Sequence, residues 1–111
     1  MANLSSELRC RCSLYEMQDV ENELSEITHR PVFLRKLRCK IVPKSGREVD
    51  GKGESSYSEI THEVTIRRNS AEGIRREMYL EYLGQRLEIR YIMPHYKDRD
   101  RVVLYCREVV V

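Results

Sequence analysis

The sequence has no tryptophan, one phenylalanine (Phe33), three prolines and five glycines among its 111 residues. It contains no apolar run near the roughly 18 residues that a membrane-spanning helix needs. Residues 1–12 hold no apolar stretch of signal-peptide length. We therefore expect a protein without a membrane partner, made and used in the cytoplasm, whose cysteines are free thiols.

The motifs of common catalytic and cofactor sites are missing as well. No serine lies in a Gly-x-Ser-x-Gly turn, and the short run Gly51, Lys52, Gly53 falls far short of a phosphate-binding loop. The histidines lie in three separate segments, and the acidic residues are scattered. We expect neither an enzyme nor a bound cofactor.

The four cysteines lack the spacing of a zinc knuckle. Cys10 and Cys12 fall on one face of a predicted strand, and Cys39 and Cys106 are at inward positions of two other predicted strands. A zinc site would need all four sulfurs to converge on one ion, whereas buried free thiols pack as small apolar groups. Packing in the core is the expectation, and a structural zinc site is the alternative.

Charged residues make up 34% of the chain, yet the 20 basic and 18 acidic residues leave a net charge of only +2. A dedicated duplex-binding module usually carries a larger and more clustered basic excess. The length is that of a single domain, residues 1–111, with one modest core. Function is therefore to be sought in assembly and binding.

Alternation of apolar and polar residues predicts strands over most of the second half of the chain. The predicted strands are residues 58–68, 78–83, 86–93 and 101–110. Within residues 86–93 the alternation places Leu87, Ile89, Tyr91 and Met93 on the inner face. Residues 69–76 break the pattern and predict one helical turn or a loop, and Gly84 marks a tight turn.

The first half predicts strands at residues 8–15 and 32–42, the second ended by Pro43. Residues 16–22 are expected to form a turn or an irregular link. In residues 23–30 Leu24 and Ile27 have helical spacing, but Ile27, Thr28 and the following Pro31 favour a strand that ends before Pro31. Residues 44–57 are glycine-rich and longer than a usual hairpin connection. The fold expected is an all-β, antiparallel β-barrel or sandwich of six or seven strands, with one long flexible loop and at most a short helical turn.

Two groups of polar residues are the candidates for partner binding. The long loop could be idle surface, or it could become ordered when a partner arrives. Likewise, the basic residues could be a solvated face, or they could meet an acidic neighbour or DNA. The candidate loop residues are Lys44, Ser45, Gly46, Arg47, Glu48, Asp50, Lys52 and Glu54, and the candidate subunit-facing or DNA-facing residues are Arg9, Arg11, Arg38, Lys40, Arg67 and Arg68.

The order of several segments resembles the head-closure, or head–tail joining, proteins of tailed bacteriophages and prophages. A P-x-S-G-R/E segment appears at residues 43–47, and a T-H-x-V-x-I-R strand at residues 61–67. A hairpin with Gly84 follows, then a strand at residues 87–92 and a last strand that ends near C-x-E at residues 106–108. The resemblance spans residues 8–109.

The resemblance implies a virion protein of the phage neck that forms a ring, a dodecamer or alternatively a hexamer. Such a ring would be assembled in the bacterial cytoplasm, join the portal or adaptor above to the tail terminator or tail below, and help retain packaged DNA. The loop at residues 44–57 would project into the channel or towards a neighbouring ring. The alternatives are another tail-completion ring protein, or a free nucleic-acid-binding barrel of oligonucleotide-binding type.

Overall fold

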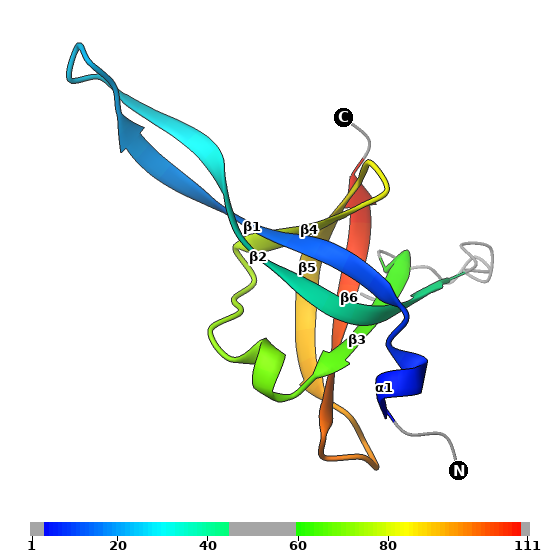
Figure 1. The fold of residues 1–111 in the computed structure, drawn as a ribbon. Coiled ribbons are helices and arrows are strands. Elements are labelled where there is room, and N and C mark those ends of the chain that lie inside the picture. The colour runs from blue at the N-terminus through cyan, green and yellow to red at the C-terminus, as the bar shows by residue number, and fades with distance from the viewer. Residues whose placement is uncertain (1–3, 45–59, 110–111) are drawn as a thin grey trace.

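In a computed structural model, which describes residues 4–44 and 60–109, the chain forms a closed six-stranded antiparallel barrel (Figure 1). The strand order around the barrel is β1-β2-β3-β6-β5-β4. The expected all-β antiparallel barrel is therefore confirmed. Its elements are α1 (Leu4–Glu7), β1 (Cys10–Glu21), β2 (Ile27–Pro43), β3 (His62–Arg67), the 3₁₀ turn η3 (Asn69–Ala71), β4 (Met78–Tyr82), β5 (Gln85–Pro94) and β6 (Arg101–Val109). No helix in these two ranges is long and apolar enough to cross a membrane.

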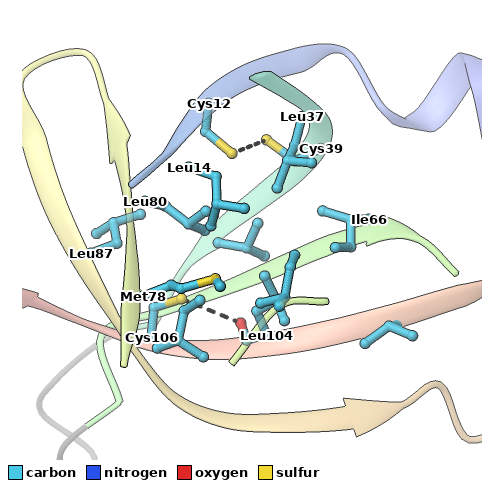
Figure 2. Close-up of a cluster of buried hydrophobic side chains, with 14 residues drawn as sticks. Cys12, Leu14, Leu37, Cys39, Ile66, Met78, Leu80, Leu87, Leu104 and Cys106 are labelled. Atoms are coloured by element: carbon cyan, nitrogen blue, oxygen red, sulfur yellow. Dashed lines mark hydrogen bonds between the residues drawn. The ribbon is translucent and has the colours of Figure 1, made fainter. Parts of the chain in front are cut away.

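The barrel interior is filled by apolar side chains that come from all six strands (Figure 2). Every second residue of a strand points to the same face, so one apolar set per strand is enough to fill the interior. The barrel closes where residues 13–16 of β1 pair with residues 78–81 of β4. Leu14 and Leu80 face each other at this seam, and neither side chain is exposed to solvent. The interior therefore holds together strands that are far apart in the sequence.

Two long strands make one end of the molecule very different from the expectation. Residues 16–21 continue strand β1 instead of forming a turn, and β2 begins at Ile27 and runs through Pro31. The predicted turn at residues 16–22 and the predicted break at Pro31 are therefore wrong. Proline is tolerated in strands that lack a second neighbour, and β2 pairs with β3 only over residues 39–43.

The outer part of the β1–β2 hairpin, residues 17–31, projects from the barrel as a two-stranded ribbon that we call the arm (Figure 1). The arm makes the molecule long, with extents of 55 × 38 × 22 Å. The radius of gyration is 15.7 Å, whereas a compact chain of this size would give about 13 Å. The arm therefore offers surface that the barrel core does not need.

A bulge at Arg90 shifts the alternation in β5. Ile89 lies opposite Cys106 and Tyr91 lies opposite Tyr105, so Arg90 has no place in the ladder. Beyond the bulge Ile92 packs against the core, while Tyr91 and Met93 are exposed. The predicted inner face was thus right for Leu87 and Ile89 and wrong for the last two positions.

The shorter connections follow the sequence closely. Leu83 and Gly84 both have positive φ, at 51° and 82°, as the two central residues of a tight hairpin turn of this hand require. The predicted helical turn at residues 69–76 is present as η3. The strand predicted at residues 58–68 begins only at His62, although Ile60 is also buried, and residues 58 and 59 lie outside the described ranges.

Candidate assembly interface

Four of the six predicted basic residues lie together on the outer side of β1 and β2. Arg11 and Arg38 are directly opposite each other in the β1–β2 ladder. Both face outward, because the alternate positions Cys12, Leu37 and Cys39 point into the barrel interior. All members of the group are exposed. Together with Lys36, two positions before Arg38 on β2, they form what we call the basic face; it consists of Arg9, Arg11, Lys36, Arg38 and Lys40.

The positive charge of the basic face is barely neutralised within the described part of the chain. Its single ion pair there joins Lys40 Nζ to Glu7 Oε1 at 3.9 Å, which is long for such a contact. Arg9 Nε donates to the backbone oxygen of Ser6 at 2.9 Å. Exposed like charges repel one another in the absence of a partner, so the basic face is suited to an acidic one.

The other two predicted basic residues, Arg67 and Arg68, follow the end of the β2–β3 ladder, whose last pair is Cys39 and Ile66, so Arg67 is beside the position of Arg38. Arg67 is opposite Arg101 in the ladder, and Arg68 Nη1 donates to the backbone oxygen of Arg99 at 3.4 Å. Arg68 and Arg101 line an open hollow beside the start of β6. The structure thus places Arg67 and Arg68 beside the other four predicted basic residues, at the end of β3 that pairs with Arg101.

The surface around Arg101 is largely charge-compensated, unlike the basic face. The Arg101 guanidinium contacts Asp100 Oδ1 at 3.0 Å and Glu7 Oε1 at 3.2 Å, with Asp98 Oδ2 at 3.8 Å. The hydrogen bond from Arg101 lowers the pKa of the Asp100 carboxyl, and the same bond raises the pKa of Arg101. This surface therefore attracts an acidic partner less strongly than the basic face does.

Of the eight predicted loop residues, only Lys44 is among the described residues. Ser45, Gly46, Arg47, Glu48, Asp50, Lys52 and Glu54 lie outside the described residues. Lys44 is described: its backbone nitrogen donates to the Thr61 oxygen at 2.7 Å, and its Nζ meets Glu63 Oε2 at 2.7 Å. Lys44 and Thr61, described residues on either side of residues 45–59, are therefore held side by side by the barrel.

The cysteines are placed by the fold as core residues. Cys12, Cys39 and Cys106 are buried, and the Cys39 thiol donates to the Cys12 sulfur at 3.5 Å (Figure 2). That hydrogen bond and burial raise the pKa of Cys39 far above its usual range. In the described ranges no three His, Cys, Asp or Glu side chains come together as metal ligands would.

The arm ends in an acidic tip that sequence reasoning missed. Asn22 Oδ1 accepts hydrogen bonds from the backbone nitrogens of Leu24 and Glu26, both at 2.9 Å, and these fix the turn. Leu24 is 77% exposed and Ile27 71% exposed. A turn-forming Asn between the β-branched residues Val20 and Ile27 was the available signal. We define the acidic tip as Asp19, Glu21, Glu23 and Glu26 together with Leu24 and Ile27.

An aromatic cluster joins the base of the arm to the barrel. The Tyr15 and Tyr79 rings stack at a centroid distance of 5.3 Å, and Phe33 meets Tyr15 edge-on at 5.7 Å. The Arg86 guanidinium lies 4.0 Å from the Tyr79 ring centroid. Such contacts contribute about 0.5–1.5 kcal/mol each beyond burial, and burial raises the pKa of Tyr79. The arm is thus anchored in a defined direction.

Comparison with known proteins gives one matching family and two solved structures of similar fold. The model of a family described as phage head completion protein matches residues 4–109. The solution structure of a Shigella flexneri 2a protein is similar in fold, with a TM-score of 0.71, 19% identity and 96% of each chain covered. A chain from the virion of a native gene transfer agent particle has a TM-score of 0.60 and 14% identity, with 91% of this chain and 94% of that chain covered. No curated protein sequence matches this chain.

Proposed function

Because this chain belongs to the phage head completion protein family, a family of structural virion proteins, we propose that it completes the neck of a phage or prophage particle. In this proposal several copies form a ring, a dodecamer or alternatively a hexamer, between the portal or adaptor and the tail terminator or tail. The ring closes the head and helps retain packaged DNA. Assembly takes place in the host cytoplasm.

The family match over residues 4–109 is the observation that carries this proposal. The distribution of charge supports it. A chain of net charge +2 nevertheless keeps a basic face and an acidic tip at separate places, and complementary charge on two surfaces favours ordered contacts between protein subunits. The fold shared with a chain of a gene transfer agent virion is consistent with the same role.

Electron microscopy of particles that carry this chain tests the proposal directly. We expect its density as a ring between the portal and the tail. When the phage is produced without this chain, we expect heads that have no tail and that lose their DNA. Tailed, DNA-filled particles assembled without it would refute the proposal.

The candidate loop can be tested by deleting residues 46–55. The barrel is expected to stay folded, because the Lys44–Thr61 hydrogen bond already holds the two ends of the loop together. Joining of heads to tails is expected to fall, since the deletion removes Arg47, Glu48 and four further charged or glycine candidates from the partner surface. Circular dichroism reports the fold and plaque titre reports the joining.

A replacement of residues 46–55 by ten Gly and Ser residues is the matched control for this deletion. It keeps the length of the loop and removes its charges. Wild-type titre in both variants would mean that the loop is idle. Loss in the deletion alone would assign the function to loop length rather than to its charged side chains.

A further inference from the structure

The acidic tip and the basic face carry opposite charge and lie at opposite ends of the β1–β2 hairpin. Residues 19–30 contain four carboxylates and one arginine, Arg30. Asp19 pairs with His29 at 2.8 Å, and Glu26 accepts from the Asn22 side chain at 3.1 Å. Glu21 and Glu23 form no ion pair with any residue that the structure describes. Each surface therefore has unused charge that the other could neutralise.

One copy cannot bring these two surfaces together by itself. Arg11 and Glu21 are ten residues apart on the continuous strand β1, which at about 3.3 Å per residue separates them by roughly 33 Å. The ribbon runs straight away from the barrel (Figure 1). Any contact between the acidic tip and the basic face must therefore join two molecules.

The apolar part of the acidic tip also has a counterpart. Val42 follows Arg38 and Lys40 on the same outward side of β2 and is 40% exposed. The aliphatic stems of the arginine and lysine side chains add apolar area beside it. Leu24 and Ile27 could pack on this area while the carboxylates around them meet the basic groups. The hydrogen bonds of Asn22 keep the tip in one shape before it binds, which reduces the entropy lost on association.

We propose that the acidic tip of one copy docks on the basic face of a second copy, so that subunits associate head to tail. This contact rests on the proposed function, since it names the interface between neighbours in the ring. It uses two different surfaces of one chain, and such contacts close into a ring when the rotation between neighbours allows. A DNA backbone is the less favoured occupant, because it would leave the acidic tip without a partner and the net charge is only +2.

Charge reversal tests this contact in the full-length protein. One variant carries Glu23→Lys and Glu26→Lys at the tip, and another carries Arg11→Glu and Arg38→Glu on the face. Because each variant then opposes like charges, self-association at low salt is expected to weaken at least about 10-fold in each. An equimolar mixture of the two, and a chain with all four substitutions, are expected to recover it, since tip and face are again complementary. Sedimentation velocity over a concentration series measures the association.

The matched control for the face variant is Lys97→Glu with Arg99→Glu, which makes the same change of net charge at exposed positions between β5 and β6. It is expected to associate as the wild type does. A wild type that stays monomeric up to about 1 mM at low salt, or reversal variants that weaken association without mutual recovery, would overturn the contact. A face variant that associates as the wild type does but no longer binds a short DNA duplex would also overturn the contact. The ring density in particles is measured independently, so failure here leaves the neck position standing.

Discussion

Replacing Leu80 with alanine is expected to lower the free energy of unfolding by about 2–5 kcal/mol. Leu80 is fully buried and lies opposite Leu14 at the seam where β4 closes the barrel on β1. The substitution removes apolar contacts and leaves a cavity at a seam of only four residue pairs. Since small domains have a total stability of about 5–15 kcal/mol, a large part of it would be lost. Urea denaturation followed by circular dichroism measures the change.

Leu83→Ala is the matched control for this variant. It deletes the same atoms three residues further along the chain, at a turn position that is 83% exposed. The expected change there is within about 0.5 kcal/mol. Equal effects of the two substitutions would show that β4 does not close the barrel as described.

Alkylation of Cys106 in the folded protein is expected to be slower than in the unfolded chain by about 1,000-fold at pH 8 from thiolate depletion alone. Burial raises the pKa of Cys106 from its ordinary value of 9.0 to about 12. The thiolate fraction at pH 8 thus falls from about one in ten to about one in ten thousand. The shift is upward, so the protection is complete below pH 9 and fades as the pH approaches 12. Iodoacetamide labelling with peptide mass spectrometry measures the rate.

Two controls show whether slow labelling of Cys106 is caused by its burial or by an inactive reagent. In strong denaturant all four native cysteines are expected to react at similar rates. An added Lys97→Cys, at an exposed position, is expected to react rapidly while Cys106 of the same folded molecule stays intact. Rapid native labelling of Cys106 would contradict its place in the barrel interior.

The core strands could be predicted because their signal is local. In β3 the buried residues Val64 and Ile66 alternate with Thr65 and Arg67, and the structure keeps that order. The turn at Leu83 and Gly84 is equally local, since it depends on which residues tolerate positive φ. The same alternation placed Cys12, Cys39 and Cys106 in the interior, where they lie.

The failures occur where pairing partners decide the outcome. Residues 16–21 are mostly polar and lack a continuous apolar face, yet they form a strand because residues 27–32 pair with them. The bulge at Arg90 arises from the register between β5 and β6, and no feature of residues 86–93 alone indicates it. The acidic tip was missed for the same reason: its residues were divided between a turn predicted at residues 16–22 and a strand predicted at residues 23–30, whereas the pairing of β1 with β2 brings them together at the end of the arm.

The sequence by itself determined the inward-facing residues of the core strands up to the bulge at Arg90, the turn at Leu83 and Gly84, and the family to which the chain is similar, because these depend on neighbouring residues and their order. Only the tertiary structure decided that Leu14 meets Leu80, that the β1–β2 ribbon extends beyond the barrel, and that Arg11 and Arg38 lie opposite each other. These depend on register between strands far apart in the chain, where several pairings satisfy the same alternation and the closure of the barrel selects one.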